Sequence, residues 1–401
     1  MRSVRHAFAV ESRLLVSVLL LALGGCGDPV SPDGYTYSVP PQTGDGWVTA
    51  SLADEGMDPA PLVALMNDLR GRDDHMIHGL LVARHGRLVF EEYFPGRQFD
   101  LEAEDPLQQM DVAFDRNTVH YMGSANKSVT SALVGIAIGR GLVSGAGARL
   151  FSFFPEYAAL NDAQKDGITL AHLLTMTAGW PWYDDDIDAS NSDESRMFSE
   201  ADPVRFILER PLSTTPGSRM EYHSGSTVLL GEVVRRASGM DVHAFARQYL
   251  FGPLGITESK WAHCAGDPDV AFAGGGLYLR PRDMAKFGQL YLQDGTWDGN
   301  QVVPQEWVRQ SVQTAVVSVD QFAVHYRHLG YGYQWWPGQW DGGVGAFLAA
   351  GWGGQFTMVV PSRALVVVVT GGYYDVNSMQ GSVGQWIFDD IIYRRILAAV
   401  H

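Results

Sequence analysis

The sequence predicts a mixed α/β (α+β) fold, in which an antiparallel β-sheet is flanked by helices and accompanied by a mostly helical part. Three observations predict it. Apolar runs joined by turn residues occur near residue 85 and again near residue 361, as in β-hairpins. Residues 141–269 are dominated by helical apolar spacing and loops, and residues 385–399 have the periodicity of a closing helix. The sheet is therefore expected to be built from both ends of the folded region.

The first expected elements are a helix and a hairpin. Residues 62–70 carry apolar side chains at helical spacing after the turn signal Asp58-Pro59. Residues 80–84 and 88–93 have strand composition and are joined at His85-Gly86, which favours a tight turn. Both elements are expected to belong to the α/β part.

A second hairpin is expected toward the C-terminal end. Residues 357–360 and 365–370 are rich in valine and flank Pro361-Ser362.

The N-terminal segment, residues 1–25, has the pattern of an export signal. Three arginines precede an apolar run at residues 14–23, which is too short to be a good membrane span. The run ends in Leu-Gly-Gly before Cys26, which resembles a bacterial lipobox and predicts cleavage before Cys26 and acylation of this cysteine. The alternative is an ordinary secretory signal. A lipoprotein would be exported to the cell envelope and held on a membrane surface by its acyl chains.

The remainder divides by composition and length. Residues 26–46 are rich in Pro, Gly and Asp, as expected of a flexible tether. Residues 47–401 exceed the usual size of a single core, so two packed parts are expected. The α/β part would comprise residues 47–140 and 270–401, and the helical part residues 141–269.

Charge and cysteine content exclude several classes of protein. The formal charge is −16, and residues 1–25 carry three arginines and one glutamate, so the remainder carries −18. This acidity argues against nucleic acid as a partner and against electrostatic membrane binding, so that anchoring would depend on lipid. With Cys26 acylated, Cys264 has no disulfide partner and is expected to be a partly buried structural thiol. No cluster has metal-ligand spacing, and no metal or cofactor is expected.

Ser124 and Lys127 form the most informative motif. They stand three residues apart where an apolar helix is predicted to begin, so both side chains lie on one helical face. Unpaired N–H groups and the positive end of the helix dipole surround a hydroxyl in the first turn. A nearby amine can help to remove the proton of such a serine.

Two further motif-bearing segments follow the Ser-x-x-Lys motif along the chain. Residues 216–234 contain Tyr222-x-Ser224 before an apolar helix, and residues 350–360 form a glycine-rich start of a strand. With supporting stretches at residues 168–180 and 274–288, they resemble the serine β-lactamase and penicillin-binding-protein superfamily from about residue 56 onward. The nearest likeness is to the class C β-lactamase-like branch, which includes esterases and 6-aminohexanoate-oligomer hydrolases. No Gly-x-Ser-x-Gly motif of the α/β-hydrolase kind occurs.

The resemblance implies a β-lactamase/transpeptidase-like fold and a serine hydrolase that opens an ester or amide through an acyl-serine intermediate. An esterase or a 6-aminohexanoate-hydrolase-like amidase is the leading interpretation, and a β-lactamase or D,D-peptidase is the enzymatic alternative. A non-catalytic ligand-binding lipoprotein is the alternative from another class.

The resemblance also implies roles for individual residues. Ser124 would be the nucleophile, and Tyr222 the general base in acylation and the acid toward the leaving group. A free tyrosine titrates near ~10, so a nearby ammonium must favour the phenolate. Lys127 could supply that charge or take the proton itself, and the sequence does not divide the work. Ser224 stands where the class C enzymes carry asparagine, and His223 is expected to be structural.

The glycine-rich segment is expected to complete the site. Backbone N–H groups of Ser124 and Gln355 are the oxyanion-hole candidates. Gly353 and Gly354 would let an acyl group approach the strand closely. Trp352 stands where β-lactamases carry a cation that helps to recognise the substrate carboxylate. The absence of a positive charge there favours an apolar, neutral or cationic acyl group over a penicillin.

Aromatic and acidic residues near these motifs are weaker candidates. Trp180 is a candidate substrate contact, and tryptophans at residues 335, 336 and 340 precede the glycine-rich segment. About half of these aromatics are expected to pack in the core. The acidic residues at 184–188 could meet a substrate ammonium, although a solvated loop is the simpler interpretation.

Overall fold

The protein is described by a computed structural model that covers residues 34–103, 111–183, 192–321, 323–375 and 381–401. Residues 35–401 form one compact unit. The predicted signal segment, Cys26 and the acidic residues at 184–188 lie outside the described residues. No helix in the described part of the chain has both the length and the apolar character needed to cross a bilayer.

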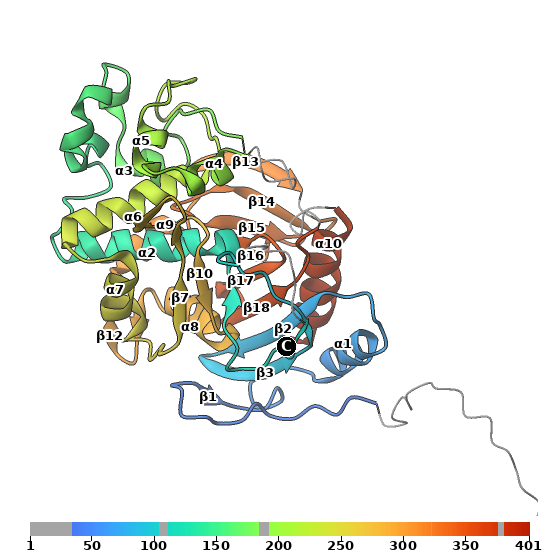
Figure 1. Ribbon diagram of the computed structural model, residues 1–401. Helices are drawn as coiled ribbons and strands as arrows, with labels where there is room; N and C mark the ends of the chain where they lie inside the picture. The colour runs from blue at the N-terminus through green and yellow to red at the C-terminus, as the bar shows by residue number, and fades with distance from the viewer. Residues whose placement is uncertain (1–33, 104–110, 184–191, 322, 376–380) are drawn as a thin grey trace, which may run out of the picture. The chain divides into compact units, whose positions relative to one another are not determined.

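The described residues include a nine-stranded sheet in the order β1-β3-β2-β18-β17-β16-β15-β14-β13 (Figure 1). Only the short β1–β3 pair is parallel among these strands, and all the other pairs are antiparallel. The strands are β1 (Val48–Thr49), β2 (Ile77–Arg84), β3 (Arg87–Tyr93), β13 (Val316–Gln321), β14 (Tyr326–Tyr331), β15 (Trp336–Trp340), β16 (Gly345–Gly351), β17 (Gln355–Val360) and β18 (Leu365–Gly371). The expected sheet from both ends of the folded region is confirmed, and so is the predicted fold class.

Both predicted hairpins lie side by side at the centre of this sheet. Strand β18 pairs with β17 on one side and with β2 on the other. Successive residues of β18 face opposite cores: Val366 and Val368 belong to one apolar cluster, and Val367 and Val369 belong to the other. The uninterrupted valine run is therefore explained by a strand that is covered on both faces.

Helices cover the two faces of the sheet. On one face, α8 (Pro281–Leu292) packs against β2, β17 and β18, and α2 (Asn126–Gly139) packs against β16. On the other, α1 (Ala60–Arg70) packs with the C-terminal helix η8 (Trp386–Ile396), which continues α10 (Gly381–Gln385). Both the predicted first helix and the predicted closing helix are present.

The middle of the chain is mostly helical, as predicted, with a few short strands. Its helices are α3 (Leu170–Leu174), α4 (Asp193–Ser199), α5 (Pro203–Leu208), α6 (Ser224–Ser238) and α7 (Val242–Ala246), and α9 (Gln305–Ser311) follows later in the chain. The short strands outside the main sheet are β4 (Gly96–Arg97), β5 (Asp111–Val112), β6 (His120–Tyr121), β7 (Ser259–Trp261), β8 (His263–Cys264), β9 (Asp267–Ala271), β10 (Leu277–Leu279), β11 (Thr296–Trp297) and β12 (Asn300–Gln301). One apolar cluster contains residues of α2 and α6 and of the sheet, so the two expected parts share a core.

The segment before β1 differs from the flexible tether expected over residues 26–46. The backbone N–H of Tyr35 donates to Asn67 Oδ1 at 2.7 Å, and the hydroxyl of Tyr37 donates to the carbonyl of Val89 at 2.9 Å. Residues 35–46 are thus part of the compact unit, because tyrosines among the Pro and Gly residues hold the segment to α1 and β3. The rest of the expected tether, residues 26–33, lies outside the described residues.

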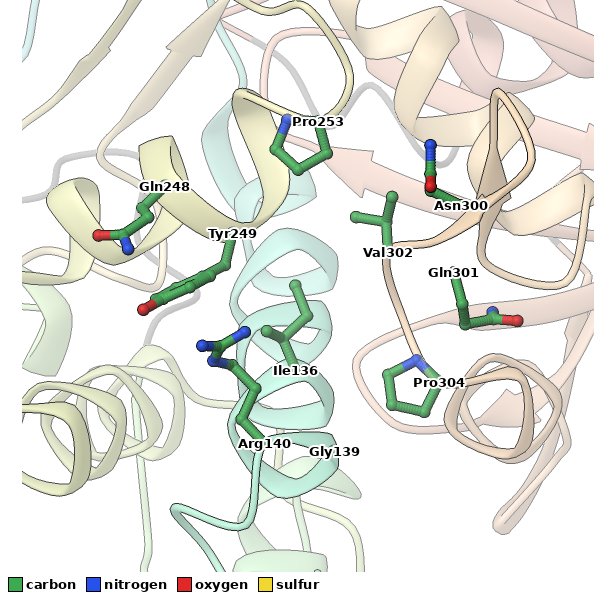
Figure 2. Close-up of a pocket in the computed structure, with 10 residues that line it drawn as sticks. All are labelled: Ile136, Gly139, Arg140, Gln248, Tyr249, Pro253, Asn300, Gln301, Val302 and Pro304. Atoms are coloured by element: carbon green, nitrogen blue, oxygen red, sulfur yellow. The ribbon is translucent and has the colours of Figure 1, made fainter.

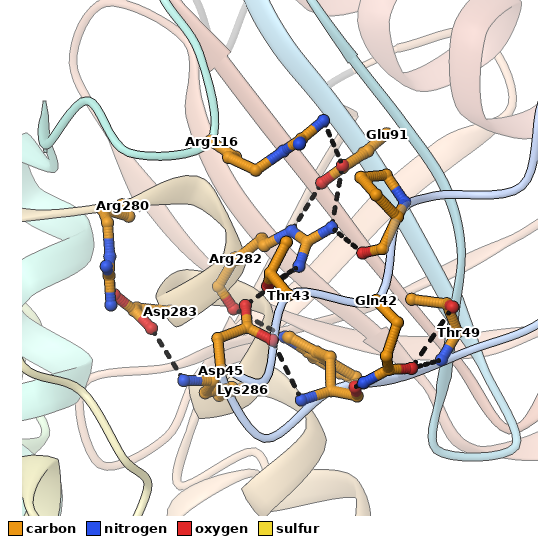
Figure 3. A network of polar contacts seen from close by, with 12 residues as sticks. Gln42, Thr43, Asp45, Thr49, Glu91, Arg116, Arg280, Arg282, Asp283 and Lys286 are labelled. Atoms are coloured by element: carbon orange, nitrogen blue, oxygen red, sulfur yellow. Dashed lines mark hydrogen bonds and ion pairs between the residues drawn. The ribbon is translucent and has the colours of Figure 1, made fainter.

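A buried network of charges fixes the same segment to α8 (Figure 3). Arg282 in α8 forms ion pairs with Glu91 of β3, at 2.6 Å, and with Asp45, at 3.0 Å. Its guanidinium also donates to the hydroxyl of Thr43 at 2.8 Å. The Arg282 and Glu91 side chains are each only 3% exposed. Burial lowers the pKa of Arg282, but the bonds to Glu91 and Asp45 together outweigh it and raise the pKa above its usual range.

Candidate active site

Ser124 lies in a tight turn at the start of a buried helix. The turn, η1 (Gly123–Ala125), runs directly into α2, and the residues of α2 from Asn126 to Ala137 are all buried. Gly123 has φ +51°, and a Cβ at this position would lie 3.1 Å from the backbone nitrogen of Trp352. Glycine is therefore required both by the backbone conformation and by the closeness of the neighbouring hairpin. The predicted helix start at Ser124 is confirmed.

Lys127 contacts Ser124 and is surrounded by oxygen atoms. Its Nζ lies 2.9 Å from Ser124 Oγ, 2.9 Å from Ser224 Oγ and 2.8 Å from the carbonyl oxygen of Gly274. The side chain is 1% exposed, whereas Ser124 is partly exposed. The amine is thus buried and has three oxygen partners.

Tyr222 contacts the Lys127 amine through its ring. The Lys127 Nζ is 5.0 Å from the centroid of the Tyr222 ring, a cation–π contact. The ring is packed by Trp336 and Tyr331, at centroid distances of 5.7 Å and 6.0 Å. The structure therefore brings the serine and the lysine of the sequence motifs into hydrogen-bond contact and places the ring of the tyrosine beside the same amine.

The start of α6 places Ser224 against Lys127. His223 is the N-cap of α6: its Nδ1 accepts from the backbone N–H of Ser226 at 3.0 Å, and its Nε2 lies 2.8 Å from Ser226 Oγ. Burial, followed by the charge of Lys127, lowers the pKa of His223 to about 3, so this imidazole is neutral. The structural role expected for His223 agrees with these contacts.

The glycine-rich segment forms the turn between β16 and β17. Gly351 pairs with Gln355, and Gly353 and Gly354 between them have φ values of +86° and +90°. A Cβ at Gly351 would collide with the carbonyl oxygen of Met122. This close approach places the turn beside η1, so that the backbone of Gln355 and that of Ser124 belong to neighbouring elements.

Trp352 belongs to an aromatic cluster beside η1. Its ring lies 5.2 Å from that of Phe99 and 5.0 Å from that of Tyr374, and Phe99 also contacts Tyr121 at 4.7 Å. Trp352 is partly exposed, whereas its aromatic neighbours are buried. One wall next to the Ser124 turn is therefore apolar.

The other predicted aromatic contacts divide between the core and the site. Trp180 has no exposed surface and packs edge-on against His223 at 6.0 Å, which is a position in the core and not one that faces a substrate. Trp335 and Trp340 are also fully buried, and Trp336 is the member of that group that contacts Tyr222. Tryptophan spacing alone did not distinguish these two situations.

Three residues near Lys127 were not singled out from the sequence. Glu194 in α4 accepts a hydrogen bond from Ser224 Oγ. Gly274 supplies the third oxygen partner of Lys127. Gln334 ties the elements together, because its side chain accepts from Thr227 of α6 at 2.9 Å and its carbonyl accepts from Ser128 of α2 at 2.6 Å. Only Gly274 had a signal, since it opens one of the supporting stretches.

Cys264 is a free, buried thiol, and burial raises its pKa to about 12. Across the described residues, no group of three or more His, Cys, Asp or Glu side chains is arranged to hold a metal ion.

A cavity of about 690 Å³ lies at the other end of α2 (Figure 2). It is lined by Ile136, Gly139, Arg140, Gln248, Tyr249, Pro253, Asn300, Gln301, Val302 and Pro304. Arg140 lies over the ring of Tyr249 at 3.9 Å. This lining includes none of the residues around Ser124, so the cavity is separate from the candidate active site.

Comparison with known proteins gives a consistent result. The family model described as Beta-lactamase matches residues 62–371. Esterase EstB of Burkholderia gladioli is 26% identical over 215 residues, which are 50% of this chain and 52% of that protein. The 6-aminohexanoate-dimer hydrolase of Paenarthrobacter ureafaciens is 24% identical over 230 residues, 54% of this chain and 57% of that protein. The chain therefore spans little more than half the length of these relatives.

Solved structures show the same fold. A putative 6-aminohexanoate-dimer hydrolase from Bacillus anthracis superposes with a TM-score of 0.64 at 20% identity, covering 82% of this chain and 81% of that one. EstCE1, described as a hydrolase with promiscuous acyltransferase activity, superposes with a TM-score of 0.62 at 16% identity, covering 86% of this chain and 100% of that one.

Proposed function

We propose that this chain, which belongs to the beta-lactamase family, is a serine hydrolase. It would cleave a carboxylic ester or amide through an acyl-Ser124 intermediate. The observation that carries the proposal is the contact of Ser124 Oγ with the buried Lys127 Nζ at 2.9 Å, with the Tyr222 ring on the same amine. A nucleophile in contact with a charged or basic group, in a site poor in water, is what acyl transfer requires.

The reaction would proceed in two halves. In acylation, Ser124 Oγ forms a bond to the substrate carbonyl carbon while its proton passes to Tyr222 or Lys127, and the carbonyl electrons move to oxygen. Collapse of this intermediate expels the alcohol or amine, which takes the proton back. Water then attacks the acyl-serine in the same way and releases the acid and free Ser124.

The oxyanion of both halves would be stabilised by backbone donors. Ser124 N–H lies in the η1 turn, and Gln355 N–H lies at the start of β17, which packs against η1. The loss of one such donor raises the barrier by roughly 3 kcal/mol in comparable sites.

The aromatic wall supports a preference for neutral or apolar acyl groups. Trp352, packed on Phe99 and Tyr374, offers a ring face and one N–H donor, with no cation to pair with a carboxylate. The named activities of the relatives, an esterase and a 6-aminohexanoate-dimer hydrolase, agree with ester or amide cleavage.

The first test is covalent labelling. Incubation with a fluorophosphonate should give one adduct, located by mass spectrometry on Ser124, and Ser124→Ala should be unlabelled. The exposed Ser152 provides a control, because Ser152→Ala should label like the wild type. No adduct on correctly folded wild-type protein would refute the nucleophile assignment.

The second test compares substrates. Turnover of p-nitrophenyl butyrate should exceed that of nitrocefin, and both should be lost in Ser124→Ala. Efficient nitrocefin hydrolysis with negligible ester turnover would favour a β-lactamase. Equal, residual ester turnover in wild type and Ser124→Ala would favour a binding lipoprotein without catalysis.

We also propose that the protein is a bacterial envelope lipoprotein, acylated at Cys26. The proposal is supported by the arginines, the apolar run and the Leu-Gly-Gly sequence before Cys26. In a bacterial host, radiolabelled palmitate should be incorporated into the wild type and not into Cys26→Ala. Equal labelling of the two proteins would exclude this anchor.

A further inference from the structure

We infer that Glu194 is a positioning residue for the proposed hydrolysis, acting through Ser224 to hold Lys127 as an ammonium, so that Lys127 does not itself take the proton of Ser124. The inference rests on the proposed function, since it assigns charge states within the same site. It concerns a residue that no sequence motif identifies.

The position of Glu194 is fixed by its neighbour in α4. The carboxylate of Asp193 accepts from the Arg210 guanidinium at 3.0 Å and from the backbone N–H of Tyr183 at 2.9 Å. These bonds anchor the first turn of α4. Glu194 follows directly and accepts the hydrogen bond of Ser224 at the start of α6.

The hydrogen bond that Ser224 donates to Glu194 sets the direction of the hydrogen bond between Ser224 and Lys127. A serine hydroxyl has one proton, and when Ser224 donates it to Glu194, only lone pairs remain for Lys127. The carbonyl of Gly274 also accepts only. Two hydrogens of the Lys127 amine therefore point to Ser224 Oγ and to the Gly274 carbonyl. The third position on the nitrogen, which holds either a hydrogen or a lone pair, faces Ser124 Oγ at 2.9 Å.

The charge of Glu194 determines what that third substituent is. Lys127 and Ser224 are each 1% exposed, so a carboxylate one hydroxyl away stabilises an ammonium more strongly than it would in water. An ammonium presents a third N–H to Ser124 and has no lone pair with which to take a proton.

Other charged and titratable groups of the described residues also lie near this amine or near Glu194. They are Tyr222 before α6, the neutral His223 of α6, the Asp193–Arg210 pair at α4, and Tyr121 of β6. Burial, followed by the field of Glu194, raises the pKa of Tyr121, so this phenol is neutral. The Gly351–Gln355 turn carries no titratable side chain.

The direct test is NMR of isotope-labelled lysine side chains. The chain contains only four lysines, and the Cε signal that disappears in Lys127→Met identifies Lys127. In Glu194→Gln, Lys127 should lose its proton at a pH at least about one unit lower than in the wild type. Glu200→Gln removes an exposed acid at the end of the same helix and should leave the Lys127 titration unchanged. An unchanged titration in Glu194→Gln would overturn the inference.

Ester turnover provides a second readout. The alkaline limb of kcat/KM should move to lower pH in Glu194→Gln by the same amount. Ser224→Ala removes the hydroxyl that links Glu194 to Lys127. In the Ser224→Ala background, Glu194→Gln should therefore change kcat/KM by less than about twofold. If the effects of Ser224→Ala and Glu194→Gln on kcat/KM are additive, the inference is overturned. If Glu194→Gln does not fold, the Lys127 titration is measured in Ser224→Ala alone, and an unchanged titration there overturns the inference. A shifted Lys127 titration in a protein that neither turns over esters nor labels at Ser124 would support the Glu194 assignment and refute the proposed function.

Discussion

The amine of Lys127 lies 5.0 Å from the ring centroid of Tyr222, while the same nitrogen contacts Ser124 Oγ at 2.9 Å. One buried amine is thus shared by a hydroxyl and by an aromatic ring that carries a phenol. The ring is held by Trp336 and Tyr331, so its position does not depend on its own hydroxyl.

Tyr222→Phe should therefore remove the proposed proton acceptor without moving the ring. We expect ester turnover to fall by about 10²–10⁴-fold, the usual contribution of general acid–base catalysis, with little change in melting temperature. Steady-state kinetics and thermal unfolding measure the two effects. Tyr183, which is 51% exposed, offers a control, because Tyr183→Phe should keep full activity. Wild-type turnover in Tyr222→Phe would remove this residue from the mechanism.

Gly351→Ala should disturb both stability and activity. Its Cβ would collide with the carbonyl of Met122, and relief of that contact would push the Trp352 turn away from η1. Overpacking of this kind costs about 1–3 kcal/mol of unfolding free energy. Denaturant unfolding and ester turnover should both decline.

The same strand provides the control for this substitution. At Gly345, the other end of β16, a Cβ would meet nothing within 4 Å. Gly345→Ala should therefore stay near wild type in both measurements. If the two variants lose the same stability, the loss comes from glycine replacement in the strand and not from contact with η1.

The elements of this fold could be predicted because their patterns are local. The valine run of β18 and the helical spacing of α1 appear directly in the sequence, and Ser124-x-x-Lys127 placed two groups on one turn. The partnership of Ser224 with Glu194 could not be predicted, because it joins α6 to a residue thirty positions earlier through tertiary packing. The burial of Trp180 could not be predicted either, since the local sequence around a tryptophan does not show whether its side chain packs in the core or lines a cleft.

His223 should make stability depend on pH. Its pKa is lowered to about 3 in the folded protein, whereas an unfolded histidine titrates near ~6.5. Between these values the unfolded chain binds a proton that the native protein does not, so stability is lost as pH falls below about 6.5. The slope for one such histidine is ~1.4 kcal/mol per pH unit.

The measurement is thermal unfolding from about pH 7 to about pH 5, where this linkage acts. His223→Asn keeps a side chain that can cap α6 but does not titrate, so its melting temperature should fall less over this range. His401, which is exposed at the C-terminal end, provides a control whose substitution by Asn should preserve the wild-type slope. Identical slopes for His223→Asn and wild type would show that this imidazole does not contribute to the acid sensitivity, to which the buried His78 and His120, with pKa values lowered to about 2 and about 4 by burial, also contribute.

Arg282 should be among the most sensitive charged positions for stability. Arg282→Leu would leave Glu91, which is 3% exposed, with Arg116 at 3.1 Å as its ion-pair partner, and would release Asp45 and Thr43 from α8. Removing one member of a buried pair costs about 3–5 kcal/mol when the remaining charge is left uncompensated, so the Arg116 contact should keep the loss near the lower end of this range. The exposed pair of Arg309 with Asp294 is the matched control, and Arg309→Leu should cost less than about 1 kcal/mol. Denaturant unfolding of both variants measures the difference. Similar losses would mean that the segment before β1 is held by the Tyr35 and Tyr37 contacts and not by this network.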